Sequence, residues 1–381
     1  MVYLDNAATS WPKPPEVIRA VTRFLTEQSG SPSRAGHALA EAAGRMVRNV
    51  RGQIARMLHT DDPDRIILAL NATDALNIAI KGALREGDHV ICSAVDHNSV
   101  SRPLQAMAET GFIELTRLSL TAEGAVDPEA VRRAIRPDTR LVALNHASNV
   151  TGVIQPAADI GRIAREHDLL FLVDASQSAG LLDLDVAAMN VDLLAFPGHK
   201  SLLGPTGTGA LYVGPRADLR PFREGGTGAD SATPTQPRGL PVHLEAGTPN
   251  TVGFAGLSAA LELLDPAEHL RRGRELCRIL LDALAEREGI RLAFPWGADR
   301  CVPIVSFRVE GMAPDEVAAV LDQSFRIAVR PGLHCAPYVH RAMGTFPEGT
   351  VRVAPGWANT PEHMDRCAKA LIEVAAAGVW R

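Results

Sequence analysis

Short apolar runs alternate with longer amphipathic segments through most of the chain. The run RIILAL at 65–70 is followed by a segment with helical spacing and then by the run DHVICSAV at 88–95. Strands that are apolar throughout and alternate with helices are typical of a mostly parallel sheet covered on both faces. The pattern therefore predicts an α/β fold, with strands at 65–70, 88–95, 140–148, 168–176, 192–197 and 209–214 and helices at 73–84 and 157–167.

A smaller unit is expected after residue 255. The segment 216–247 is rich in glycine, proline and threonine, which predicts a long surface connection. The patterns that follow it predict helices at 255–264 and 270–289 and strands near 303–309 and 325–330. We therefore expect a large domain at 16–255 and a smaller C-terminal α/β domain at 256–381, with residues 1–15 packed near the functional site.

Composition narrows the function classes. The chain is 46% hydrophobic with a net charge of −5, which argues against nucleic acid or an anionic membrane as a main partner. No window reaches the roughly 20 continuous apolar residues of a membrane span, and the first residues do not resemble a signal peptide. The five cysteines form no C-x-x-C pair, so a cytoplasmic protein without a disulfide framework or structural zinc is expected.

Polar clusters follow five of the expected strands at the point where each strand ends. In open parallel sheets, ligands bind beyond the carboxyl ends of the strands, which meet along one edge. We therefore expect the following clusters to line one rim: Asn71–Thr73, Asp96–His97, Ser148–Asn149, Asp174–Gln177 and Gly198–Lys200.

Lys200 is the most informative of these residues. Lysine and arginine together number 39, but only Lys13, Lys81, Lys200 and Lys369 are lysines. An arginine could supply positive charge at this position, but it could not supply a titratable amine that forms a Schiff base. The loop GPTGTG at 204–209 lacks the Gly-Lys-Ser/Thr ending of a phosphate-binding P-loop and the third glycine of a dinucleotide site, so a nucleotide enzyme is a weak alternative.

Three other rim residues each allow a structural and a functional interpretation. Thr73 is expected to be a helix N-cap, and the same helix end could hold a phosphate. Asp174 could pair with a protonated pyridine nitrogen, or it could be a helix cap or a salt-bridge partner. His97 could stack on a planar ring and move protons, or it could be a hydrogen-bonded loop histidine.

Two candidates come from the C-terminal third. Cys335 lies between Pro331-Gly332 and Pro337, in a segment that cannot be helical throughout, so its thiol is available for chemistry. The other cysteines lie in or beside apolar segments, at Cys92, Cys277, Cys301 and Cys367. His334 and His340 beside Cys335 lack a fourth ligand and the usual metal spacing. Arg352, on a short alternating strand, is either a surface arginine or a bidentate clamp for a carboxylate.

In this order, the motifs resemble those of the class V aminotransferase-like enzymes, a family of fold-type I pyridoxal-phosphate enzymes, and most closely the group II cysteine desulfurases. The resemblance covers nearly the whole chain, through YLDNAAT, ATDALN, DHNSV, SNVTG, DASQ, GHK, GPTGTG, EAGTPNT and RPGLHCAP.

The resemblance implies pyridoxal 5'-phosphate as cofactor, bonded covalently to Lys200. It implies that Asp174 keeps the pyridine nitrogen protonated and that His97 stacks on the ring. The cofactor-binding set by resemblance is Ala72, Thr73, His97, Asn149, Asp174, Gln177, His199, Lys200 and Thr251. Thr251 matches a segment that reaches the phosphate site of a neighbouring subunit, which implies a homodimer.

The activity implied is conversion of L-cysteine to L-alanine, catalysed by Lys200, His97 and Cys335. Asn149 and Arg352 would bind the substrate, and Cys335 would hold the sulfur as a persulfide for an acceptor protein, with iron–sulfur cluster assembly as the family's usual destination. A selenocysteine lyase, an aminotransferase and a silent pyridoxal-phosphate or sulfur-relay protein are the alternatives. Pro197 and Ala72 depart from the family, because relatives often carry a hydroxyl at these positions.

Overall fold

A computed structural model describes residues 1–32, 36–229, 231–285 and 287–378. Its central sheet has seven strands in the order β2-β8-β7-β6-β5-β3-β4. The strands are β2 (Ile66–Ala69), β3 (Asp88–Ser93), β4 (Ile113–Leu118), β5 (Thr139–Asn145), β6 (Leu170–Asp174), β7 (Leu193–Pro197) and β8 (Gly209–Val213). Only β8 runs against its neighbours, so the predicted mostly parallel α/β sheet is confirmed.

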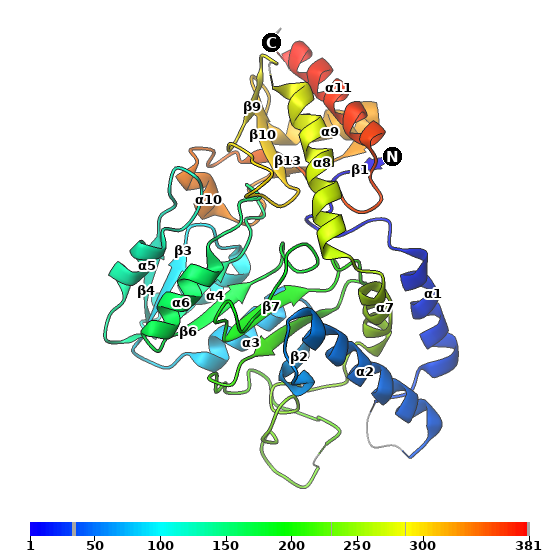
Figure 1. Cartoon of the computed structure of the whole chain (residues 1–381), viewed down its shortest axis with the longest axis vertical. Coiled ribbons are helices and arrows are strands. Elements are labelled where there is room, and N and C mark those ends of the chain that lie inside the picture. The colour runs from blue at the N-terminus through cyan, green and yellow to red at the C-terminus, as the bar shows by residue number, and fades with distance from the viewer. Residues whose placement is uncertain (33–35, 230, 286, 379–381) are drawn as a thin grey trace.

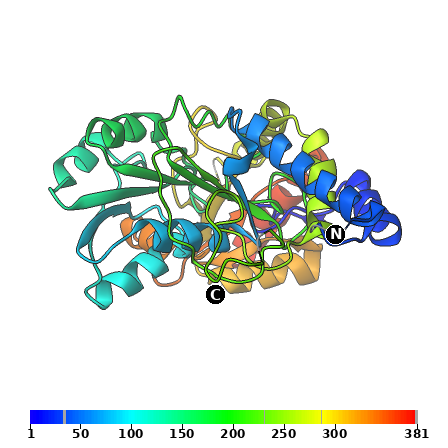
Figure 2. The same cartoon turned by 90° about the horizontal axis from the view of Figure 1, so that it is seen from below.

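Helices cover both faces of this sheet, as Figures 1 and 2 show. On β6, Phe171 and Val173 pack into one apolar cluster, while Leu170 and Leu172 pack into another. The first cluster includes α2 (Ala38–Met57) and α6 (Ala157–Glu166), and the second includes α3 (Ala72–Ala83) and α4 (Asn98–Glu109). Burial on both faces explains why the strands are apolar throughout.

A smaller four-stranded sheet lies above the central sheet in Figure 1. Its strands are β9 (Ile290–Leu292), β10 (Val305–Val309), β12 (Arg330–Gly332) and β13 (Thr350–Val353), and all of its pairings are antiparallel. It shares an apolar core with α8 (Pro266–Leu284), α9 (Pro314–Phe325) and α11 (Pro361–Gly378). The expected domain limits, 16–255 and 256–381, stay a prediction.

The N-terminal segment links the two sheets. Its strand β1 (Val2–Tyr3) pairs with β11 (Ile327–Ala328) beside the smaller sheet. The chain then passes the central sheet and enters α1 (Pro15–Arg23), which packs on α7 (Thr251–Glu262). The remaining elements are the π-helical turn Phe24–Gln28, the 3-10 turn Pro63–Arg65, α5 (Pro128–Ala134) and α10 (Pro337–Ala342).

Two local expectations need correction. Thr73 is not the N-cap of its helix: α3 begins at Ala72, and the side chain of Asn71 accepts the hydrogen bond from the Asp74 N–H. Asparagine is as good an N-cap as threonine, and this arrangement leaves the Thr73 hydroxyl free for other contacts. The strand expected near 325–330 is two short strands, β11 and β12, which pair in different sheets.

None of the helices in the described ranges is both long enough and apolar enough to cross a membrane. The segment 216–247 forms no helix or strand where the structure describes it.

Candidate active site

The five predicted polar clusters meet in one cavity at the carboxyl ends of the parallel strands. The cavity is lined by Asn71, Ala72, Thr73, His97, Ser99, Asn145, Asn149, Asp174, Ser176, Gln177, Pro197, His199 and Lys200. Eight of the nine residues expected to bind the cofactor are in this set, and the ninth, Thr251, lies elsewhere at the start of α7. The structure therefore brings together residues that the sequence places more than 120 positions apart.

Lys200 lies in the turn that follows β7. Burial lowers the pKa of its amine to about 8, although the negative charge of Asp174 raises that pKa in part. The turn is fixed by the N-terminal segment, because the carbonyl of His199 accepts hydrogen bonds from the Ser10 N–H at 3.0 Å and the Lys13 ammonium at 2.9 Å. A depressed pKa makes the Lys200 amine a better nucleophile near neutral pH.

Asp174 ends β6 and is 1% exposed. Its Oδ1 accepts hydrogen bonds from the backbone N–H and the hydroxyl of Ser176. Both of these bonds fall on one oxygen, and the carboxylate lines the cavity, where a cationic nitrogen would find a partner. Gln177 donates from Nε2 to the carbonyl of Ala7 at 3.0 Å, which ties the cavity to the N-terminal segment.

Two helix N-termini face the cavity. Thr73 lies in the first turn of α3, and its hydroxyl is 2.7 Å from the hydroxyl of Ser99 in the first turn of α4. His97 is the N-cap of α4 and accepts at Nδ1 from the Ser99 N–H at 3.1 Å. Backbone N–H groups at a helix start form a favourable site for a phosphate. Burial lowers the pKa of His97 to about 4, so its imidazole is neutral.

Two cavity residues hold buried polar atoms that lack a partner among the described residues. They are Nδ1 of His199 and Oδ1 of Asn149. Burial, together with the charges of Lys200 and Lys13, lowers the pKa of His199 to about 4. Unpaired buried polar atoms are costly unless a ligand meets them. A buried amine, a carboxylate and unpaired polar atoms beside two helix starts together fit pyridoxal phosphate.

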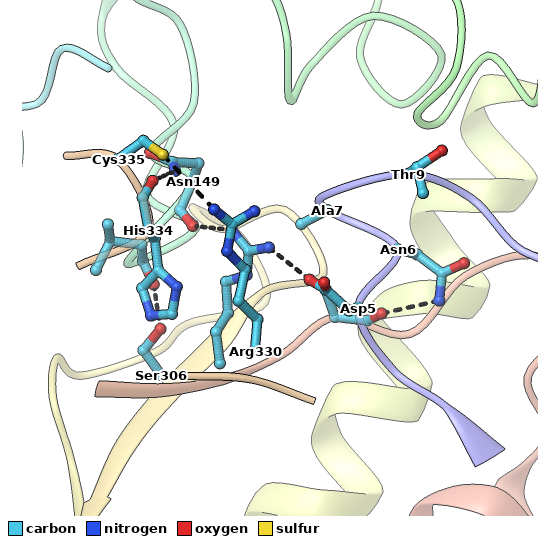
Figure 3. A network of polar contacts seen from close by, with 12 residues as sticks. Asp5, Asn6, Ala7, Thr9, Asn149, Ser306, Arg330, His334 and Cys335 are labelled. Carbon is cyan, nitrogen blue, oxygen red and sulfur yellow. Dashed lines mark hydrogen bonds and ion pairs between the residues drawn. The ribbon is translucent and has the colours of Figure 1, made fainter. Parts of the chain in front are cut away.

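Cys335 lies on the loop between β12 and α10 and is exposed. Its carbonyl accepts from the Asn98 N–H at 2.8 Å, and the carbonyl of His334 accepts from Nδ2 of Asn149 at 2.6 Å (Figure 3). Both loop residues have positive φ, 49° at His334 and 59° at Cys335. Left-handed backbone is rare outside glycine and is held here by contacts to the cavity rim. A guanidinium nitrogen of Arg330 is 3.6 Å from the sulfur.

The other four cysteines are buried, in agreement with their apolar sequence surroundings. Burial raises the pKa of Cys367 to about 12 and raises the pKa of Cys92, Cys277 and Cys301 as well. The thiolate is the reactive form of cysteine, so these four thiols are unsuited to nucleophilic chemistry.

Arg352 does not line the cavity and is not a surface arginine. Its side chain is 1% exposed, and its two terminal nitrogens donate to the carbonyl of Asn149 at 2.9 Å and to Oδ1 of Asp5 at 2.7 Å. Its Nε is buried without a partner among the described residues. Asn149 thus contacts both the Cys335 loop, through its side chain, and Arg352, through its carbonyl.

Sequence reasoning gave no role to Asp5, Lys13, Ser99 or Arg330. Asp5 belongs to the quoted motif YLDNAAT, and Lys13 is one of the four lysines, so both carried a signal. Ser99 and Arg330 also lie in quoted motifs, DHNSV and RPGLHCAP, and membership of these motifs was the signal that could have found them. Pro197 and Ala72 both line the cavity without a side-chain donor, while His199 and the start of α3 remain available there.

Comparisons with known proteins identify the family. Residues 2–367 match the family described as Aminotransferase class-V. The chain is 34% identical over 387 residues to a probable cysteine desulfurase of Methanothermobacter thermautotrophicus, covering 99% of this chain and 95% of the relative. A cysteine desulfurase structure from Thermococcus onnurineus NA1 matches with a TM-score of 0.92 at 30% identity, covering 99% and 95% of the two chains. Cysteine desulfurase CsdA of Escherichia coli matches with a TM-score of 0.88 at 29% identity, covering 98% and 94%.

Proposed function

The chain belongs to the class V aminotransferase family, and from that premise we propose that it is a pyridoxal-phosphate-dependent cysteine desulfurase that converts L-cysteine to L-alanine. It has the fold of the cysteine desulfurases it matches, fold type I. One observation carries the proposal: the hollow that holds Cys335 shares Thr73, His97 and Ser99 with the cavity that holds Lys200. In our proposal, the amine of Lys200 and the exposed thiol of Cys335 therefore act on the same space.

When bound, pyridoxal phosphate supplies an aldehyde for the Lys200 amine and a ring that stabilises negative charge at the substrate α-carbon. In our proposal, His199, the Thr73 hydroxyl and the N–H groups at the start of α3 hold its phosphate. Asp174 would hold the ring nitrogen, and the neutral imidazole of His97 would contact the ring. Gln177 and Asn149 would contact the ring hydroxyl and the substrate amine.

Lys200 is the proposed general base. Its Nζ accepts the α-proton of L-cysteine and later returns a proton to the carbon skeleton, which becomes alanine. Arg352 binds the substrate carboxylate in this scheme, since its Nε and the remaining protons of its terminal nitrogens are not used by Asp5 or Asn149. A bidentate guanidinium–carboxylate contact would orient the α-carbon.

Cys335 is the proposed nucleophile. Its thiolate attacks the sulfur of the bound cysteine, so that an S–S bond forms while the C–S bond of the substrate breaks. The electron pair of that bond passes to the carbon skeleton, which takes up protons and leaves as alanine. The sum is L-cysteine plus enzyme thiol giving L-alanine plus enzyme persulfide. Exposure of Cys335 then lets an acceptor protein, in the cytoplasm in our proposal, take the sulfur.

Product analysis tests this function. With L-cysteine and a thiol reductant, the holoenzyme is expected to form alanine and sulfide in equal amounts. Pyruvate and ammonia instead would identify a lyase that eliminates sulfide without a persulfide, and the proposal would fail.

Capture of the cofactor is expected to depend on pH through Lys200. Only the neutral amine attacks an aldehyde, and the pKa of this amine is lowered from its ordinary 10.5 to about 8. The rate of cofactor incorporation into apoenzyme should therefore rise as pH increases through about 8 and level off above it. Absorbance after rapid mixing with pyridoxal phosphate measures this rate, and a midpoint near that of ordinary lysine would contradict the assignment.

We further propose a homodimer in which Thr251 of each chain reaches the phosphate site of the other. Support comes from the position of Thr251, which is half-buried at the start of α7 and outside its own chain's cavity. Random mixing of Lys200→Ala chains with Thr251→Ala chains should make half of the dimers hybrids. Each hybrid then has one site with both changes and one with neither.

Activity of the mixture should therefore rise toward about a quarter of wild type, above either parent. Activity equal to the average of the two parents would place Thr251 in its own chain's site. A fully active protein that sediments as a monomer would contradict the proposed homodimer.

A further inference from the structure

Two arginines lie opposite each other on neighbouring strands beside the proposed substrate site. Arg330 on β12 and Arg352 on β13 are direct cross-strand partners. Like charges placed opposite each other on neighbouring strands destabilise a sheet unless an anion lies between them. Loss of water around the buried Arg352 lowers the pKa of its guanidinium, and the positive charge of Arg330 adds to this lowering, while the charge and hydrogen bond of Asp5 oppose it. Among the described residues, one carboxylate forms an ion pair with these two arginines. It is Asp5, and its partner is Arg352.

Asp5 belongs to the N-terminal segment, which places its carboxylate beside Arg352. Its backbone is fixed by a parallel bridge to Ala354, and its carbonyl accepts from the Ala8 N–H and the Tyr3 hydroxyl. Its side chain contacts Arg352 at 2.7 Å and is 20% exposed, whereas the Arg352 side chain is 1% exposed. The carboxylate can therefore reach water by rotating its side chain, while the guanidinium cannot.

The donors of Arg352 are only partly used. A guanidinium has five N–H groups. One goes to the carbonyl of Asn149, one goes to Asp5, and the N–H of Nε is buried without a partner in the described chain. This arginine can thus receive a second carboxylate, but that carboxylate would arrive next to the negative charge of Asp5.

We propose that Asp5 is an internal counter-ion that competes with the carboxylate of the substrate for Arg352 and thereby sets the affinity for carboxylate-bearing ligands. This inference rests on the proposed role of Arg352 in binding the carboxylate of L-cysteine. A buried cation without any anion is strongly destabilising, so Asp5 neutralises Arg352 in the free enzyme. The substrate then replaces an existing ion pair rather than an empty site, and binds more weakly than it would otherwise.

The direction of the change in ligand affinity distinguishes competition by Asp5 from a purely structural role of this residue. Asp5→Asn keeps an oxygen that can accept from Arg352 but removes the negative charge. If Asp5 competes, the variant should bind L-alanine, the proposed product, about three- to ten-fold more tightly, and the KM for L-cysteine should fall by a similar factor without a rise in kcat. If Asp5 only anchors the N-terminal segment, affinity should stay the same or decrease.

Three controls make the test specific. Cysteamine has the amine and thiol of cysteine but no carboxylate, so its affinity should not change in Asp5→Asn. Asn6→Ala loosens the same segment by removing hydrogen bonds to Ala354 and Asn359 without a change of charge, and should not tighten L-alanine. In an Arg352→Gln background, the gain from Asp5→Asn should vanish, as a double-mutant cycle requires of a direct interaction.

Calorimetric titration of holoenzyme with L-alanine and with cysteamine measures these affinities independently of turnover. The inference is overturned if a folded Asp5→Asn binds L-alanine no more tightly, if cysteamine gains equally, or if Asn6→Ala has the same effect. Should Asp5→Asn fail to fold, Asp5→Ser removes the charge with a smaller side chain and carries the same expectations. If wild type forms no alanine from L-cysteine while L-alanine binding still responds to Asp5→Asn, the proposed function fails and this inference stands.

Discussion

Replacement of Cys335 by alanine is expected to lower alanine and sulfide formation from L-cysteine by about 10³-fold or more. Removal of a covalent nucleophile leaves only positioning and electrostatic stabilisation, which do not break the C–S bond. The variant should still bind cofactor and L-cysteine, because Lys200, His199 and Asp174 lie on other loops of the cavity. Steady-state rates, together with the cofactor content of the purified variant, measure both effects.

The matched control is Cys301→Ala, since Cys301 is also free but is buried and has a raised pKa. Removal of the buried thiol should lower the free energy of unfolding by about 1 kcal/mol, but the rate per folded holoenzyme should stay near wild type. A Cys335→Ala variant that still forms alanine at a near-wild-type rate would show that the loop is not the sulfur carrier.

Replacement of Lys200 by alanine is expected to remove activity by a comparable or larger factor. The variant loses both the covalent attachment of the cofactor and the proposed general base, and these two roles act in successive steps. Borohydride should fix a phosphopyridoxyl group to Lys200 in wild type and to no lysine in the variant. Peptide mass spectrometry after reduction locates the label.

Lys369→Ala is the control for this experiment, because Lys369 is exposed on α11, within the smaller C-terminal unit. It should keep wild-type activity and wild-type labelling of Lys200. A label on Lys13, Lys81 or Lys369 in the wild-type protein would contradict the assignment of the cofactor amine.

Much of the fold could be predicted from the sequence, because burial imposes a simple pattern of apolar residues on the chain. Strands buried on both faces must be apolar throughout, so β2, β3, β5, β6, β7 and β8 were visible as runs. The carboxyl ends of parallel strands meet along one edge, so the sequence alone predicts that Lys200, Asp174 and His97 lie together. The sequence also predicted that Cys335 lies in a loop with an available thiol, because prolines on both sides exclude a continuous helix.

Contacts between segments that are distant in the sequence could not be predicted in the same way. Asp5 and Arg352 are separated by 347 positions, and no local pattern indicates that they pair. Arg352 was expected to be either exposed or open to a ligand, whereas the structure buries it between two protein acceptors. The N-cap of α3 was assigned to Thr73 rather than Asn71 because two adequate capping residues lie within three positions, and propensity alone does not choose between them.

The central claim is that sulfur leaves L-cysteine as a persulfide on Cys335 while the carbon skeleton leaves as alanine. It is tested most directly by a single turnover of holoenzyme with limiting L-cysteine and no reductant, followed by quantification of alanine and peptide mass spectrometry of the protein. We predict one alanine for each added sulfur, with the extra sulfur on the peptide that contains Cys335 and on none of the peptides that contain Cys92, Cys277, Cys301 or Cys367. Alanine without a persulfide at Cys335, or sulfur on another cysteine, would contradict the account.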